Sequence, residues 1–466
     1  MKHAIISLLV TALALNVFAQ ERPKPKIDLK YGAQREGRRT DPEMARWRGH
    51  RLGMIIHYGL YSLAGGSWNG VNYSYAAEFI KSSAKVPNEE YDQLLKSFNP
   101  SRNAPKEWAQ LAKTMGAKYV VITTKHHEGF CLWPSKYTDF DVESTPYKTD
   151  FLGEFINACD QLGLDVMLYY SILDWHHKGW RYQLKDDGDR ATFMDFWEFA
   201  SLQLEELLER YPVIKGFWFD GTWDASVKNN GHLTFELEQR LRKIKPGLVI
   251  GSRLRADETG SRHFDANGQL MGDYEQGWER KLPTAPLKND WECVMTIPEN
   301  QWGYHAKWTG HVKDSIELIE MASRCTSLDG NFVLNIGPRG DGSIREEEAK
   351  LAKEIGAWMT KNGSAIYGCG TSGLENQAWG WMTRKEKTNE VNAIVFNVPI
   401  SGRLAIQLNK GETIKGAMLN NKALRVEEDS GGRYFIHLPK QLPQSAFVVK
   451  VVIAGGNQNV ADAAKI

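Results

Sequence analysis

The chain has 466 residues, of which 42% are hydrophobic, and a formal net charge of +1. This length and composition predict two domains, or one large barrel with an appended unit. The near-neutral charge gives no electrostatic reason to expect a nucleic-acid partner. After the N-terminal segment no apolar run is long enough to cross a bilayer, so no membrane span is expected.

The N-terminus has the pattern of a secretory signal peptide. A charged start at residues 1–3 precedes an apolar run over residues 4–17, and small and polar residues follow. We therefore expect cleavage after Ala19. No Cys lies near that position, which argues against a lipid anchor. The mature protein is predicted to be exported, to the periplasm or the extracellular space, with residues 20–40 as an N-terminal extension.

Residues 41–367 alternate short apolar segments with amphipathic ones, which predicts a parallel sheet covered by helices. Helices are expected between most strands, for example over 104–115, 151–162 and 193–210. This alternation favours a (β/α)8-type barrel with one strand irregular or missed. A doubly wound open sheet is the alternative, although no GxGxxG follows a strand. The predicted strands are 53–61, 118–124, 165–171, 214–220, 248–253, 294–297 and 331–336.

After Gly370 the helical pattern ends, and alternating segments separated by turn residues follow. This pattern predicts an antiparallel β-sandwich over residues 371–456, with a short polar tail over 457–466. The role of the sandwich and the oligomeric state are left open. The predicted sandwich strands are 379–383, 393–398, 404–408, 434–438 and 447–453.

Asp220 directly follows the apolar run 216–219 and precedes Gly221. Such a run suits a strand that is buried on both faces, and barrel enzymes place catalytic groups at the carboxyl ends of strands. A single Asp after a strand is as often a helix cap or a loop residue. The other strand ends must therefore decide whether Asp220 belongs to a site.

Polar and aromatic residues gather at the ends of the other predicted strands as well. Each His alone is more often structural than functional, but several at successive strand ends indicate a site, because a barrel collects these ends on one face. In chain order the strand ends carry His57, then His126 and His127, then Tyr169 with residues 174–177 beyond it, then Trp218 and Asp220, then Arg253.

Two chemistries could use such residues. In a metal-dependent hydrolase, His side chains and Asp220 would bind zinc. Neighbouring residues on a strand point to opposite faces, so the adjacent pair His126 and His127 argues against this. In sugar chemistry, neutral imidazoles, an Arg and aromatic faces bind hydroxyls while two carboxylates cleave the bond. The second chemistry is favoured, and no metal and no cofactor are predicted.

The chain also resembles the α-L-fucosidases of glycoside hydrolase family 29, from about Trp47 through the C-terminal sandwich. The motifs that carry this resemblance are 53–62 with His57, Ala77-Glu78-Phe79, Lys125-His126-His127-Glu128-Gly129-Phe130, Trp218-Phe219-Asp220-Gly221, Trp291-Glu292-Cys293, Trp302-Gly303-Tyr304, and 330–338 with Asp341-Gly342. The resemblance implies an exo-acting enzyme that removes terminal α-linked L-fucose from fucosylated oligosaccharides or glycoconjugates. It leaves open whether the linkage is α-1,2, α-1,3/4 or α-1,6.

The resemblance also implies residue roles. Asp220 would be the nucleophile of a retaining mechanism, and Glu279 would be the acid/base, with Glu275 and Glu292 as alternatives. The implied sugar contacts are His57, Glu78, His126, His127, Tyr169, Trp218, Arg253 and Trp302. Two positions depart from the family pattern: Phe79 replaces a Trp, and Gly251-Ser252 replaces Asn-Asp before Arg253. The alternative function is a carbohydrate-binding protein on a degenerate glycosidase scaffold.

Overall fold

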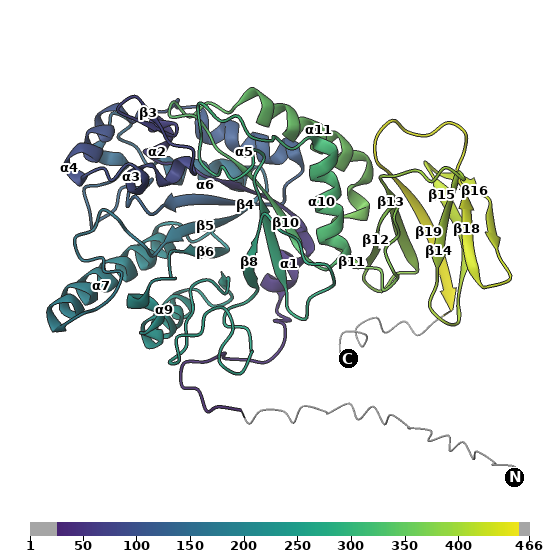
Figure 1. The fold of residues 1–466 in the computed structure, drawn as a ribbon, viewed down its shortest axis with the longest axis horizontal. Helices are drawn as coiled ribbons and strands as arrows, with labels where there is room; N and C mark the ends of the chain where they lie inside the picture. Colours follow the sequence, from purple (N-terminus) through teal and green to yellow (C-terminus); the bar gives the residue numbers. More distant parts are fainter. Residues whose placement is uncertain (1–25, 456–466) are drawn as a thin grey trace, which may run out of the picture.

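A computed structural model of the protein describes residues 26–455 (Figure 1), so the predicted signal peptide and the tail lie outside the described residues. Eight parallel strands form one sheet in the order β7-β6-β5-β4-β1-β10-β9-β8. Their bounds are β1 (Leu52–Ile56), β4 (Tyr119–Lys125), β5 (Asp165–Ser171), β6 (Gly216–Asp220), β7 (Val249–Ile250), β8 (Glu275–Glu279), β9 (Trp291–Met295) and β10 (Asn331–Ile336).

The sheet closes on itself between its two edge strands, β7 and β8. There the amide N of Asp273 donates to the carbonyl O of Ile250 (2.7 Å), and the amide N of Ser252 donates to that of Tyr274 (3.0 Å). The predicted (β/α)8-type barrel is therefore confirmed, and the open sheet is not formed. The strand that the sequence pattern does not predict is β8, because its sequence Glu-Gln-Gly-Trp-Glu is polar and mostly half-buried.

Helices lie outside the barrel and follow most of its strands (Figure 1). The predicted helix over 104–115 is observed with those bounds, whereas α7 begins six residues before the predicted 193–210, behind an N-cap formed by Asp186. The helices are α1 (Pro42–His50), α5 (Ala104–Met115), α6 (Phe151–Gln161), α7 (Asp187–Arg210), α9 (Gly231–Ile244), α10 (Ser315–Ser327) and α11 (Glu346–Asn362). Shorter elements are α2 (Tyr61–Ala64), β2 (Ser67–Trp68), β3 (Val71–Asn72), a 3-10 turn (Ala77–Phe79), α3 (Ile80–Ser83), α4 (Asn88–Tyr91) and α8 (Ala225–Lys228).

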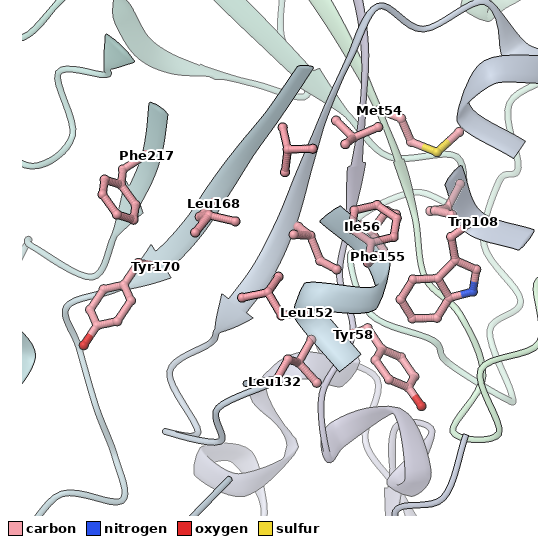
Figure 2. Packing of buried hydrophobic residues seen from close by; sticks show 14 of the residues in the cluster. Met54, Ile56, Tyr58, Trp108, Leu132, Leu152, Phe155, Leu168, Tyr170 and Phe217 are labelled. Carbon is pink, nitrogen blue, oxygen red and sulfur yellow. The ribbon is translucent and has the colours of Figure 1, made fainter. Parts of the chain in front are cut away.

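Alternate strand residues face outward and pack against these helices. Met54 and Ile56 of β1 and Leu168 of β5 belong to one buried cluster together with Trp108 of α5 and Phe155 of α6 (Figure 2). The period of two along each strand sends the residues between them into the barrel. No helix of the described residues is long and apolar enough to span a membrane.

The barrel interior holds a second buried cluster, which closes one end of the barrel. Trp47 of α1 packs there with its ring centroid 4.5 Å from that of Tyr274. Gly53 leaves room for Tyr119, because a Cβ at Gly53 would lie 2.7 Å from the Tyr119 ring. Since α1 fills the end where the strands begin, a ligand can reach the interior only at the carboxyl ends of the strands.

The C-terminal strands form two antiparallel sheets beside α10 and α11 (Figure 1), so the predicted β-sandwich is confirmed. Trp358 of α11 donates to the carbonyl O of Ala446 (2.7 Å) across this contact. One sheet contains β11 (Cys369–Thr371), β12 (Gly380–Lys385), β13 (Glu390–Val395), β19 (Phe447–Gly455), β15 (Glu412–Leu419) and β16 (Lys422–Leu424). The other contains β14 (Arg403–Gln407), β18 (Arg433–His437) and β17 (Val426–Glu428). The sequence pattern misses β11, β15, β16 and β17, which are short or largely polar.

Candidate active site

A cavity of about 400 Å³ opens at the carboxyl ends of the barrel strands. The proposed catalytic and sugar-binding residues all line this one cavity, namely His57, Glu78, His126, His127, Tyr169, Trp218, Asp220, Arg253, Glu279 and Trp302. Phe79, one of the two departures from the family pattern, lines it as well.

Asp220 ends β6 and receives hydrogen bonds on both carboxylate oxygens. Arg253 Nη1 donates to Oδ1 (2.9 Å) and Tyr169 Oη donates to Oδ2 (2.8 Å), while His127 Nε2 lies 3.8 Å from Oδ2. Burial alone would raise the pKa of Asp220, but Arg253, His127 and Tyr169 together outweigh it, so the pKa lies below its usual range. Asp220 is therefore a carboxylate at neutral pH, as a nucleophile must be.

Arg253 joins the two carboxylates of the site. Its Nη1 binds Asp220, its Nη2 donates to Glu279 Oε1, and its Nε donates to the carbonyl O of Gln276 (3.2 Å). Burial would lower the pKa of Arg253, but Glu279 and Asp220 together raise it above its usual range. The permanently charged guanidinium thus holds the carboxyl groups of Asp220 and Glu279 at the same cavity.

The two alternatives to Glu279 lie outside the cavity lining. Glu275 accepts from Trp278 Nε1 (3.2 Å) and from Asn289 Nδ2 (2.9 Å). Glu292 is buried inside the barrel, where Tyr119 Oη and Trp218 Nε1 donate to its two oxygens at 2.8 and 2.7 Å. Neither carboxylate is placed to reach a bound sugar.

The burial of Glu292 can be tested, because its ionisation makes the unfolding free energy depend on pH. Burial raises the pKa of Glu292 to about 7. The protonated side chain therefore stabilises the folded state. This stabilisation is complete below the pKa that Glu292 has in the unfolded chain, and it is lost as the pH rises through 7. Relative to Glu292→Gln, which carries no proton to lose, wild type should lose up to about 3 kcal/mol of unfolding free energy between pH 5 and pH 8. Urea unfolding of both proteins at both pH values measures this, and a pH-independent difference would contradict it.

His57 and His127 are buried residues that line the cavity, and each has a hydrogen-bond partner on Nδ1. His57 Nδ1 lies 2.6 Å from Asn335 Oδ1, and His127 Nδ1 lies 2.6 Å from Ser171 Oγ. Burial lowers the pKa of both imidazoles to about 4. Both are neutral at physiological pH and can form hydrogen bonds with hydroxyls.

The expectation that His126 and His127 point to opposite faces is wrong. Their ring centroids lie 4.2 Å apart, and both line the cavity. The alternation rule does not apply to them because β4 ends at Lys125, one residue before the pair. Among residues 26–455 no group of three His, Cys, Asp or Glu side chains is arranged to hold a metal ion.

Three residues that line the cavity carry a buried polar atom without a hydrogen-bond partner in the described part of the chain: His126 Nδ1, Glu78 Oε1 and Trp308 Nε1. The other oxygen of Glu78, Oε2, accepts from the amide N of Gly303 (2.9 Å). Burial raises the pKa of Glu78 to about 7. Because an unpartnered buried polar atom is costly, these three atoms are suited to pairing with a ligand.

Aromatic rings form the walls. Tyr169 is stacked between His126 and Trp218, at centroid distances of 5.4 and 5.2 Å. The Trp302 ring lies 5.2 Å from His57, and the Phe79 ring meets His127 edge-on at 5.3 Å. Rings in these positions offer apolar faces to the carbon side of a sugar.

His176 and His177, also noted beyond the third strand, do not reach the cavity. His176 stacks on Phe140 at 3.8 Å, and His177 on Phe199 at 4.5 Å.

Several other cavity residues are not predicted from the sequence, because they lie on loops without a periodic pattern. These are Ser74, Tyr75, Ala76, Trp223, Arg280, Asn300 and Trp308, of which only Arg280 could have been found, from its place directly after Glu279.

Most glycoside hydrolases use two carboxyl groups beside the glycosidic bond and a pocket for the sugar. Both are present here, on the strand ends of a barrel. The fold and the site therefore define a glycoside hydrolase. The family profile described as alpha-L-fucosidase matches residues 18–364. The chain belongs to the α-L-fucosidase family.

Individual relatives agree with this assignment. An α-L-fucosidase of Branchiostoma floridae is 31% identical over 429 residues, which cover 86% of this chain and 91% of that protein. A crystal structure of a family 29 α-L-fucosidase from Bacteroides thetaiotaomicron matches with a TM-score of 0.90 and 49% identity, covering 92% of this chain and 98% of that one. Another structure from that organism, also with a TM-score of 0.90 and 49% identity, covers 92% of this chain and 100% of that one. It is a trapped covalent intermediate with 2-fluoro-fucosyl fluoride in a Glu-to-Gln variant.

Proposed function

We propose that this protein hydrolyses terminal α-linked L-fucose from fucosylated oligosaccharides or glycoconjugates with retention of anomeric configuration. Asp220 would be the nucleophile and Glu279 the acid/base. The observation that carries this assignment is the shared guanidinium of Arg253, which binds both carboxylates at one cavity. The covalent intermediate trapped in the relative from Bacteroides thetaiotaomicron supports the retaining mechanism.

The reaction would proceed in two displacements. An Asp220 oxygen attacks the anomeric carbon while Glu279 protonates the leaving oxygen, which gives a β-linked fucosyl ester and a free alcohol. Glu279, now a carboxylate, then removes a proton from water as that water attacks the same carbon. The C–O bond to Asp220 breaks, fucose leaves with its original configuration, and both carboxyl groups return to their starting states.

Sugar recognition would use the buried polar atoms described above. Glu78 Oε1 and His126 Nδ1 have no partner among residues 26–455, and His57 and His127 each use only Nδ1 in the hydrogen bonds to Asn335 and Ser171. A sugar that lacks one of the matching hydroxyls would leave a buried group unpaired, which is the basis for rejecting deoxy sugars and epimers. Trp302 would face the methyl group of fucose.

The leaving group would contact the mouth of the cavity. Tyr75 and Trp223 line the cavity and are 62% and 38% exposed, so their faces are open to a second sugar. Arg280 and Asn300 also lie there and are hydrogen-bonded to each other. Because these residues come from loops, they would set the linkage preference.

We also propose that the enzyme is exported after cleavage at Ala19, and acts in the periplasm or the extracellular space.

The test of the proposed function is hydrolysis of 4-nitrophenyl α-L-fucoside by purified enzyme with and without chelator. We expect turnover in both conditions, with α-L-fucose as the first-formed product by proton NMR. Loss of turnover in chelator would point to a metal-dependent hydrolase. Binding of fucosylated glycans without turnover of the aryl fucoside or of any glycan would favour the carbohydrate-binding alternative. A panel of α-1,2, α-1,3/4 and α-1,6 fucosides then gives the linkage.

A further inference from the structure

We propose that Asn335 and Ser171 act as positioning residues that fix the tautomers of His57 and His127. Each partner holds the imidazole proton on Nδ1, so both rings present an unprotonated Nε2 to the cavity and accept hydrogen bonds from sugar hydroxyls. The part of this inference that concerns the sugar rests on the proposed function, whereas the tautomers themselves follow from the hydrogen bonds alone.

The tautomer of His57 follows from the amide of Asn335. Asn335 Nδ2 lies 2.7 Å from the carbonyl O of Trp302, which can only accept. The amide nitrogen must therefore face that carbonyl, which leaves Oδ1 facing His57 Nδ1 at 2.6 Å. An amide oxygen can only accept, so His57 Nδ1 carries the proton. In a neutral ring the second nitrogen, Nε2, is then the acceptor.

The tautomer of His127 follows from the hydroxyl of Ser171. Ser171 Oγ lies 2.5 Å from the carbonyl O of Leu173, so its only hydrogen is donated there. Oγ can therefore only accept from His127 Nδ1, at 2.6 Å. The proton of this ring is again on Nδ1, and Nε2 is unprotonated. Asn335 on β10 and Ser171 on β5 thus have the same effect from different strands.

The unprotonated Nε2 of His127 matters for the nucleophile. It lies 3.8 Å from Asp220 Oδ2, which already accepts from Tyr169. In the other tautomer the Nε2 proton would be offered to Asp220 and would lower the nucleophilicity of the carboxylate. With the proton on Nδ1, Nε2 instead accepts from a sugar hydroxyl beside the reacting carbon.

The charge of His57 depends on its surroundings. The titratable groups that face it are Asp220, His126, His127 and Tyr169, and its direct partner Asn335 is neutral. Asn335→Asp would add a carboxylate at this contact and favour the imidazolium, in which both nitrogens are donors. Ser171→Ala removes the acceptor of His127 Nδ1 with little change in shape, so the proton of His127 can move to Nε2.

The experiment is long-range ¹H–¹⁵N NMR of enzyme labelled with ¹⁵N-histidine, with the two rings assigned by loss of their signals in His57→Gln and His127→Gln. In wild type we expect the Nδ1-protonated pattern for both rings near pH 7. In Ser171→Ala the His127 pattern should change to Nε2-protonated, with kcat/KM for 4-nitrophenyl α-L-fucoside about tenfold lower or more. Ser323→Ala is the matched control, because Ser323 is a buried hydroxyl donating to Ile319 on α10, away from the cavity.

Asn335→Asp supplies a second readout that a purely structural role would not change. The acid limb of its kcat/KM profile should move to higher pH by about one unit or more, as His57 becomes easier to protonate. Nε2-protonated rings in wild type, or an unchanged His127 pattern in Ser171→Ala, would overturn the inference even if the enzyme turns over fucosides. Expected tautomers without any fucoside turnover would instead contradict the proposed function and leave the tautomer assignment standing.

Discussion

Asp220→Ala should lower kcat for every fucoside by about 10⁴-fold or more, because the proposed mechanism forms the glycosyl ester on the Asp220 carboxylate. The fold should be retained, since Asp220 lies at a strand end and lines the cavity. The measurement is the rate with 4-nitrophenyl α-L-fucoside, together with circular dichroism of the variant. Asp160→Ala, on the exposed side of α6, is the matched control and should keep wild-type activity.

Added azide can take the place of the missing carboxylate in Asp220→Ala. Because azide then attacks the substrate directly, the product should be β-L-fucosyl azide, with inverted configuration. Activity of Asp220→Ala within tenfold of wild type would show that another group is the nucleophile.

Glu279→Ala is expected to affect substrates according to their leaving groups. Oligosaccharides, which leave as alkoxides unless protonated, should lose about 10²- to 10⁴-fold in kcat/KM, whereas an activated aryl fucoside should lose much less in the first step. The measurement is kcat/KM for a natural fucosylated glycan and for 4-nitrophenyl α-L-fucoside with each enzyme. Equal losses for both substrates would argue that Glu279 binds rather than transfers a proton.

Azide also distinguishes Glu279 from its alternatives. In Glu279→Ala the fucosyl ester on Asp220 still forms, so azide attacks that ester and the product should be α-L-fucosyl azide, with retained configuration. Glu275→Ala and Glu292→Ala are the matched comparisons, and neither should be rescued, because neither side chain lines the cavity. Rescue of Glu292→Ala alone would move the acid/base to Glu292.

The sequence by itself was sufficient for the barrel and for most of the site. Buried parallel strands appear as short apolar runs, and the carboxyl ends of such strands always meet on one face of a barrel. The residues that follow those runs, from His57 to Arg253, could therefore be placed together without any knowledge of the contacts, and they do line one cavity. Asp220 is the clearest case, because it directly follows an unbroken apolar strand.

The choice among three glutamates depended on the tertiary structure. Glu275 and Glu279 lie on β8, a polar strand without a recognisable pattern, and Glu292 lies on β9. Local sequence does not say which of their side chains turn toward the cavity, since that depends on the register of β8 against β9 and on the position of Arg253 after the neighbouring strand β7.

The same limit applies to the histidines. A histidine in the sequence supplies an imidazole. Which of its two ring nitrogens carries the proton depends on neighbours that are far away in the chain, such as Asn335 for His57. The sequence alone determined the fold class and the strand-end residues that line the cavity, because strand patterns and strand ends are local properties. Only the tertiary structure decided which carboxylate pairs with Asp220 and which ring nitrogens accept, because these depend on contacts between distant segments.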